Sequence, residues 1–220
     1  APEILKAIKK KSSNRSLSWT LARLLRHHRD AISQISLRPY VNGCLRFLAR
    51  GDDRYRLPFE VLRNANPDML VKAILASVRS ARKSKNLDRA EKYLQLVNTE
   101  DLATLETRFE LAIVRLRKVS KAPAAVSASY SAPFAEADSP LVLLSSVLRS
   151  DRFSLGKRLR AEAGFLGSDD YLYVGLHLAE RSPLERELAL SILRFIVRKY
   201  PRKKEARVAR HRLQAEGIKV

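Results

Sequence analysis

The sequence predicts an all-α fold, on the basis of three observations. Apolar residues recur three and four positions apart along most of the chain, which is the spacing of one helix face. The sequence has no sustained alternation of apolar and polar residues, the pattern of a half-buried strand. Only 7 of the 220 residues are glycine, and several of these follow a helix-like segment. Because 45% of the residues are hydrophobic, the chain can bury a core without disulfide bonds.

The first three predicted helices cover residues 17–35, 40–49 and 58–65. In the first helix a single apolar stripe steps by three and four positions. That stripe consists of Leu17, Leu21, Leu24, Leu25, His28, Ile32 and Ile35. Pro39 separates the first helix from the second. Pro58 fits the first turn of the third helix, since proline is tolerated at that position.

Three more helices are expected over residues 66–84, 86–97 and 99–119. Asn66 is a good N-cap and Pro67 a good first helical residue, so this start is the clearest in the chain. The stripe of that helix is expected to contain Met69, Leu70, Ala73, Ile74, Ser77 and Val78. The helix at 99–119 is expected to begin at Thr99, followed by acidic residues that complement the helix dipole.

The character of the sequence changes after Val119. Residues 120–140 are small, polar and proline-bearing and lack helical periodicity, which indicates a linker. Helical patterns then resume in five short segments separated by a few turn residues, which favours antiparallel helical hairpins. We therefore predict a basic arm at 1–16, an N-terminal helical lobe at 17–119, a linker at 120–140 and a C-terminal helical lobe at 141–220.

The segment from Tyr173 to Leu213 resembles the tetratricopeptide repeat. The residues at that family's offsets are Tyr173, Leu176, Ala189, Leu193 and Pro201, followed by Ala206, Ala209 and Leu213 in a terminal unit. The segment from Met69 to Val97 resembles the family more weakly, through Ala90 and Leu94. The family's glycine position holds His177. The resemblance implies a short, right-handed α-solenoid of stacked hairpins whose concave face binds another molecule, commonly a peptide, without catalysis.

The net charge is the strongest compositional signal. The chain has 43 Lys and Arg residues against 23 Asp and Glu residues, which gives a formal net charge of +20. Such a chain attracts polyanions, and the candidate partners are nucleic acid, an anionic lipid surface and an acidic protein.

Two segments concentrate this charge, one at each end of the sequence. Between Arg194 and Arg212 there are nine basic residues and one acidic residue, Glu205. The predicted polyanion-binding residues in this segment are Arg194, Arg198, Arg202, Lys203, Lys204, Arg207 and Arg210. At the other end they are Lys9, Lys10, Lys11, Arg23 and Arg26. Two structural alternatives remain: residues 1–16 form an ordinary frayed terminus, and cations at helix C-termini stabilise the helix dipole.

The sequence contains no recognisable catalytic motif. It lacks a glycine-rich phosphate loop, a nucleophile elbow and a paired-histidine zinc motif. His27 and His28 are adjacent and would point about 100° apart on a helix, so they cannot chelate one metal ion together. Asp169 and Asp170 are expected to cap a helix, and Cys44 to be buried, a reactive thiol being the alternative. We expect neither an enzyme nor a bound cofactor or metal.

These observations predict a non-catalytic helical-repeat protein that binds nucleic acid, or an assembly containing it, mainly through phosphate contacts. The alternative is a tetratricopeptide-like scaffold for an acidic protein partner. No apolar run approaches the roughly 20 residues that a membrane span requires. A cytoplasmic protein is therefore expected, although the start at Ala1 also fits a cleaved signal peptide.

Overall fold

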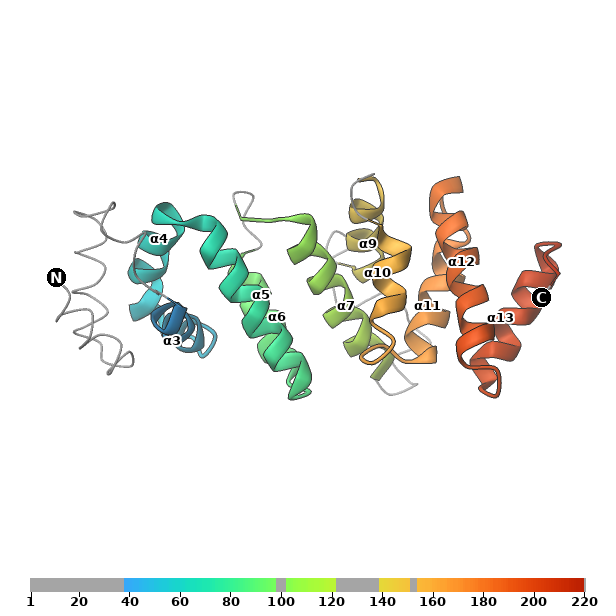
Figure 1. Ribbon diagram of the computed structural model, residues 1–220, viewed down its shortest axis with the longest axis horizontal. Helices are drawn as coiled ribbons and strands as arrows, with labels where there is room; N and C mark the ends of the chain where they lie inside the picture. Colours follow the sequence, from blue (N-terminus) through green and yellow to red (C-terminus); the bar gives the residue numbers. More distant parts are fainter. Residues whose placement is uncertain (1–37, 98–101, 122–138, 151–153, 220) are drawn as a thin grey trace. The chain divides into compact units, whose positions relative to one another are not determined.

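The computed structural model describes residues 38–97, 102–121, 139–150 and 154–219, and the regular structure in these ranges is entirely helical. The predicted all-α class is confirmed. The elements are α3 (Arg38–Leu48), η2 (Asp53–Tyr55), α4 (Arg56–Ala65), α5 (Pro67–Lys83), α6 (Leu87–Gln95), α7 (Leu105–Lys121), α9 (Pro140–Leu148), α10 (Leu155–Ala161), α11 (Ser168–Leu178), α12 (Pro183–Lys199) and α13 (Lys204–Ala215). Figure 1 labels these helices. The predicted arm at 1–16 and helix at 17–35 lie outside the described residues.

The chain divides into two compact units, residues 1–103 and 104–220. The sequence predicts one lobe over residues 17–119 and a linker at 120–140. In the structure, α7 packs against α9 and α11 of the second unit, so the division falls before this helix. Of the expected linker, residues 122–138 lie outside the described residues.

In the first unit, side-chain caps begin two successive helices. The Asn66 Oδ1 atom accepts a hydrogen bond of 3.0 Å from the Met69 backbone N–H at the start of α5, as predicted. Asn86 Oδ1 accepts one of 3.1 Å from the Arg89 N–H at the start of α6. Each cap satisfies a backbone donor that the helix itself leaves unpaired. The α5 stripe buries Leu70, Ala73, Ile74 and Val78, whereas Met69 and Ser77 are only half-buried.

Three predicted helix starts are shifted in the structure. Helix α3 begins at Arg38 and includes Pro39 in its first turn, and α4 begins two residues before Pro58, because proline is tolerated in a first turn. The predicted start of α7 at Thr99 is wrong. Thr104 caps α7 instead: its Oγ1 accepts from the Thr107 N–H at 3.2 Å, and Thr107 Oγ1 accepts from the Thr104 N–H at 2.8 Å.

The lone cysteine is part of the core of the first unit. Cys44 is 2% exposed, and its thiol donates a hydrogen bond of 3.4 Å to the Tyr55 carbonyl oxygen. Burial raises the pKa of this thiol to about 12, so it stays protonated at neutral pH. The prediction of a buried Cys44 is confirmed.

In the second unit, α11, α12 and α13 contact one another. Gly175 of α11 faces Leu193 of α12 so closely that a Cβ atom on the glycine would lie 2.7 Å from a Leu193 methyl group. Tyr171 is fully buried, and its hydroxyl donates a hydrogen bond of 2.6 Å to the Leu159 carbonyl oxygen in α10. The Tyr171 ring also packs edge-on against Phe195 of α12, with the ring centroids 5.1 Å apart.

A buried carboxylate ties α7 to α11. Asp170 is fully buried, and its Oδ2 accepts hydrogen bonds of 2.7 Å from both Arg117 Nη1 and the Gly167 backbone N–H. The second of these bonds confirms that Asp170 caps α11, as the sequence predicts. Because a buried charge needs a counter-charge, Arg117 is the cation that makes this position possible.

Replacing Arg117 with alanine is expected to lower the free energy of unfolding by about 3 kcal/mol, because it removes the cation facing a buried carboxylate. Urea unfolding of the full chain measures this loss. Arg108→Ala is the matched control, since Arg108 is exposed on the same helix. Equal losses in the two variants would contradict the role of the pair.

Glu185 has a similar role at the start of α12. Its Oε2 accepts a hydrogen bond of 3.0 Å from the Ser182 N–H, while Ser182 Oγ accepts from the Glu185 N–H at 3.4 Å, which forms a capping box. The Ser145 hydroxyl of α9 also donates to Glu185 Oε1. Burial acts to raise the pKa of Glu185, but these hydrogen bonds outweigh burial and the pKa is lowered below 4.5.

Because the folded-state pKa is lowered, the stabilisation by Glu185 is present above about pH 4.5 and is lost as the pH falls through the folded-state value. We expect Glu185→Gln to lower the free energy of unfolding by about 1 kcal/mol at neutral pH. Below the folded-state pKa of Glu185 the difference from wild type should shrink. Urea unfolding across this pH range tests this, with Glu187→Gln as the exposed control on the same helix. A difference that does not change with pH would contradict it.

Candidate polyanion-binding surface

The basic residues predicted near the C-terminus belong to α12, α13 and the turn between them. Arg194 and Arg198 are on α12, Arg202 and Lys203 are in the turn, and the other three are on α13. We call the seven residues the C-terminal basic surface. They are Arg194, Arg198, Arg202, Lys203, Lys204, Arg207 and Arg210.

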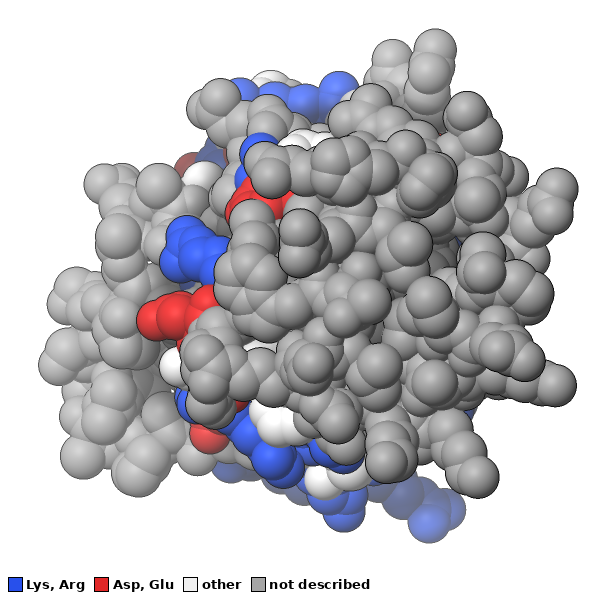
Figure 2. All heavy atoms as spheres, turned by 90° about the vertical axis from the view of Figure 1, so that its left-hand side faces the viewer, with Lys and Arg blue, Asp and Glu red and all other residues white. Residues whose placement is uncertain are grey.

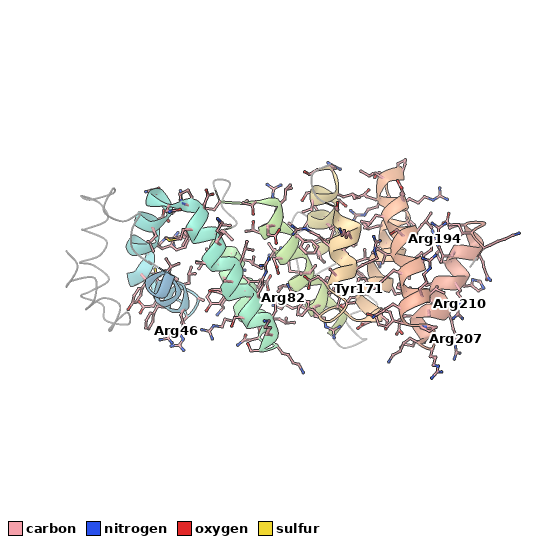
Figure 3. All side chains as sticks on the ribbon, in the orientation of Figure 1. Arg46, Arg82, Tyr171, Arg194, Arg207 and Arg210 are labelled. Carbon is pink, nitrogen blue, oxygen red and sulfur yellow. The ribbon has the colours of Figure 1, made fainter. Side chains whose placement is uncertain are left out.

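Six of these seven residues are exposed. Arg194 and Arg198 lie one helical turn apart, on the side of α12 opposite its buried residues. Arg207 is likewise on the side of α13 opposite Ala206, Ala209 and Leu213. Figure 3 labels Arg194 on α12 and Arg207 and Arg210 on α13. The packing of the two helices therefore leaves this charge at the surface.

The exception is Arg210, which is half-buried. Its Nη2 donates a hydrogen bond of 3.0 Å to the Pro201 carbonyl oxygen, so its guanidinium group reaches back to the turn that carries Arg202. Their spacing in the sequence predicts that Lys203, Arg207 and Arg210 share one face of a helix. In the structure α13 begins at Lys204, and Lys203 is its N-cap residue.

Several arginines elsewhere in the second unit form ion pairs that the C-terminal basic surface lacks. None of its seven side chains forms an ion pair with a described residue. Other arginines do: Arg158 with Glu106, Arg186 with Glu216, and Arg212 with Glu216 at 3.2 Å and Glu180 at 3.9 Å. The latter cations connect elements of the fold, so part of the net charge is structural.

Glu205, the one acidic residue in this part of the sequence, does not moderate the surface. It is 8% exposed and accepts a hydrogen bond of 3.2 Å from the Ser168 hydroxyl of α11. A solvated helix face commonly mixes acidic and basic side chains. Here the packing turns the acid inward and leaves the cations outward, so the surface carries a single sign of charge.

The helix dipole accounts for only some of these cations. Arg198 and Lys199 lie in the last turn of α12, where positive charge is favourable. Lys203 and Lys204 stand at the opposite end, at the N-terminus of α13, where the dipole disfavours positive charge. Lys203 also makes no side-chain cap hydrogen bond. These two lysines therefore occupy positions where an acidic or capping residue would stabilise the helix better.

We expect Lys203→Asp to raise the free energy of unfolding by about 1 kcal/mol, because aspartate caps a helix and complements its dipole. Thermal unfolding measures the change. Arg202→Asp is the control, since it removes the same charge one residue before the N-cap position. If both variants are stabilised alike, the gain comes from reduced charge repulsion and not from the helix terminus.

The structure does not describe the basic residues near the N-terminus that were predicted to bind a polyanion. Lys9, Lys10, Lys11, Arg23 and Arg26 lie outside the described residues, as do His27 and His28. His177 and His211 are exposed residues, and partial desolvation of the imidazole lowers the pKa of His177. Among the described residues, no group of three or more His, Cys, Asp or Glu is arranged to hold a metal ion. In the same ranges, no helix combines the length and apolar character of a membrane span.

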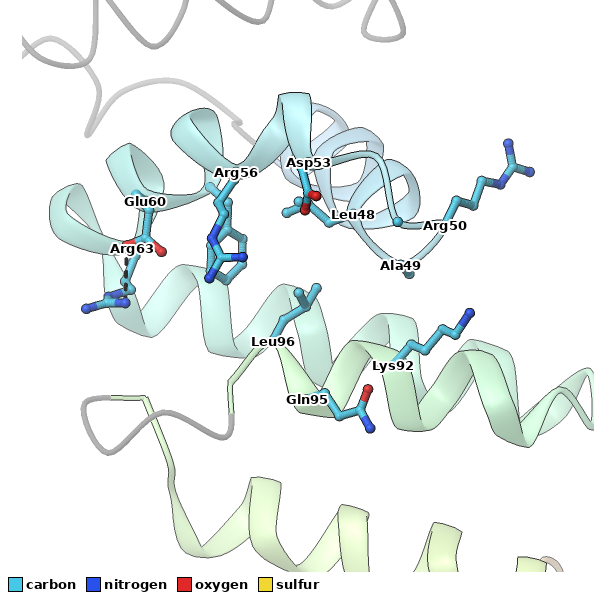
Figure 4. Close-up of a pocket in the computed structure, with 12 residues that line it drawn as sticks. Leu48, Ala49, Arg50, Asp53, Arg56, Glu60, Arg63, Lys92, Gln95 and Leu96 are labelled. Carbon is cyan, nitrogen blue, oxygen red and sulfur yellow. Dashed lines mark ion pairs between the residues drawn. The ribbon is translucent and has the colours of Figure 1, made fainter.

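Two hollows in the first unit were not anticipated from the sequence. The first encloses about 430 Å³ between α3, α4 and α6 (Figure 4). Its lining mixes Arg50, Arg56 and Lys92 with acidic residues, and Glu60 pairs with Arg63 at 3.1 Å. No histidine, cysteine, serine or threonine lines it. This lining therefore lacks a hydroxyl of serine or threonine, a thiol and an imidazole base.

The second hollow encloses about 360 Å³ and is lined by two arginines, three serines and a tyrosine, with two alanines and no acidic residue. The spacing of the serines was the available sequence signal: Ser77, Ser80 and Ser84 recur at three and four positions, like one helix face.

In Figure 2, described basic side chains stand beside acidic ones in one area and gather without them at the lower margin.

Comparison with known proteins identifies no relative: the chain matches no protein-family model, no curated protein and no solved structure.

Proposed function

We propose that this chain is a non-catalytic helical-repeat protein that binds nucleic acid, or an assembly containing it, through phosphate contacts made by the C-terminal basic surface. The observation that carries the proposal is the exposed, single-sign charge of α12 and α13. Its cations pair with no described acid, and the nearby Glu205 is buried. Such cations are available for phosphate oxygens, which arginine contacts in a bidentate manner.

Two lysines of this surface stand where positive charge lowers the stability of a helix, and their position supports the same proposal. Lys203 and Lys204 stand at a helix N-terminus, where backbone N–H groups and the dipole attract anions. A phosphate bound beside this turn would interact with these N–H groups and with the lysine side chains together. Contacts of this kind give affinity for the backbone of a nucleic acid with little reading of its sequence.

The helix contacts of the second unit support a tetratricopeptide-like arrangement. In stacked repeat folds each repeat contacts its neighbours along the stack. Here α13 contacts α11 and α12, and α11 contacts α7 and α9. Ala189, Ala206 and Ala209 are fully buried, which fits the small residues at the family's packing positions. The closest approach, however, involves Gly175 instead of the family's glycine position at His177.

A scaffold for an acidic protein partner is the second candidate, and one observation favours it. Val208 lies between two arginine positions of α13 and is 45% exposed, and Leu184 on α12 is 49% exposed. Such apolar side chains could contact a protein partner, whereas phosphate binding would not use them.

Binding of random-sequence duplex and single-stranded nucleic acid across a salt series tests the proposal. In the test variant Arg202, Lys203, Lys204 and Arg207 are changed to Gln. The control variant has the same charge and changes exposed residues elsewhere, namely Arg50, Lys72, Lys92 and Arg108, to Gln. We expect the wild type to bind with a steep dependence of log affinity on log salt. The test variant should lose about one unit of slope per phosphate contact removed.

Two outcomes would overturn the proposal. One is the absence of binding at moderate salt, and the other is an equal loss in the test and control variants. The scaffold alternative predicts a shallower salt dependence for its acidic protein partner and a loss of that binding in Val208→Asp.

A further inference from the structure

The second hollow of the first unit combines features of an anion site. Its polar lining comes from three helices: Arg46 from α3, Ser77, Ser80 and Ser84 from α5 and its C-cap, and Arg89 and Tyr93 from α6. Helix α5 contacts both α3 and α6, so the packing of the core of this unit brings the two arginines to one hollow. With two cations and no carboxylate in the lining, the local charge is positive.

Arg89 is held in place by its neighbour one turn later. Its Nε donates a hydrogen bond of 3.0 Å to the Tyr93 hydroxyl oxygen, and its guanidinium carbon lies 5.6 Å from the centroid of the Tyr93 ring. Tyr93 is itself 5% exposed, so it provides a fixed support. The hydrogen bond uses Nε and leaves both Nη groups for an acceptor in the hollow. An arginine positioned in this way loses less conformational entropy when it binds an anion.

The serines have different roles. Ser77 donates its hydroxyl proton to the Ala73 carbonyl oxygen at 2.9 Å, and Ser84 donates to the Ala81 carbonyl oxygen at 3.0 Å. Ser80 lies between them on α5 and is exposed, and its hydroxyl makes no hydrogen bond to a described residue. Its proton is therefore available to an anion. Arg46 is also exposed, and its guanidinium carbon lies 5.4 Å from the centroid of the Phe47 ring (Figure 3).

We propose that this hollow binds a phosphate group, held by Arg46, Arg89 and the Ser80 hydroxyl. Two guanidinium groups supply only donors, and the hydroxyl can donate its proton as well, which suits a group whose oxygens are all acceptors. The hollow is much larger than one oxyanion, so it has room for a phosphate ester. This inference does not rest on the proposed function, because the hollow is in the first unit and shares no residue with the C-terminal basic surface.

Titration of the isotope-labelled full chain with inorganic phosphate tests the site, with the Arg89 Nε–H and Ser80 amide resonances followed by NMR. The variants are Arg46→Gln and Ser80→Asp, which change exposed side chains and should leave the fold intact. The charge-matched controls are Arg50→Gln and Gln95→Glu, at exposed positions that do not line the hollow. We expect saturable shifts in wild type and controls, and about tenfold weaker binding in each variant.

Shifts that do not saturate, or equal affinities in variants and controls, would overturn the inference.

Two sources of the phosphate group are separated by competition between a 5′-phosphorylated and an unphosphorylated dinucleotide. Competition by the phosphorylated form alone assigns the site to a nucleic-acid end or a nucleotide, and competition by neither assigns it to free phosphate. The four-residue Gln variant of the C-terminal basic surface should bind phosphate here like wild type. The proposed function and this site can therefore fail separately.

Discussion

Inward-turned carboxylates at helix N-termini hold the second unit together, and the rest of its surface chemistry depends on them. Asp170 in α11, Glu185 in α12 and Glu205 in α13 are all in the first turn of successive helices, and all are buried. Each accepts hydrogen bonds from its own helix start, from a neighbouring helix or from both. A carboxylate at such a position stabilises the helix dipole and ties two elements together.

The distribution of charge follows from this arrangement. Because these three carboxylates are buried inside the unit, few acidic side chains remain at the surface to balance the cations on the outside of α12 and α13. The arginines that meet an acid, such as Arg186 and Arg212, do so at elements that must be held together. Apart from Arg198, whose charge suits the C-terminus of α12, the fold gives no reason for the cations that lack such partners. Their mutual repulsion is a cost that binding of a polyanion would relieve.

The two units present positive charge in different ways. In α12 and α13 the charge lies on exposed faces of the helices and in the turn between them, which suits an extended polyanion that is contacted at several phosphates. In the first unit Arg46 and Arg89 instead flank a hollow, and Tyr93 restrains one of them. A restrained arginine in a concave site suits a single small anion, because the geometry of its donors is set before binding. The two sites therefore differ in the size of the ligand they fit.

Local patterns in the sequence determined the class of fold and the starts of α5 and α6. Asn66 with Pro67 marks the start of α5, because a cap involves residues only three positions apart. The same local reasoning failed at Thr99, since a better cap at Thr104 lies a few residues further on. The exposure of the C-terminal cations also followed from helical spacing, because buried alanines and leucine alternate with them at three and four positions.

Only the tertiary structure decided which charges are paired and where a concave site forms. Arg117 meets Asp170 across 53 residues and Arg158 meets Glu106 across 52, and nothing in their local sequence indicates the partner. Glu205 does not offset the charge of the basic surface because it turns inward and accepts a hydrogen bond from Ser168 in another helix. The hollow between α3, α5 and α6 likewise requires three separate segments. Helix spacing is a property of neighbours along the chain, whereas ion pairs and cavities depend on how helices pack.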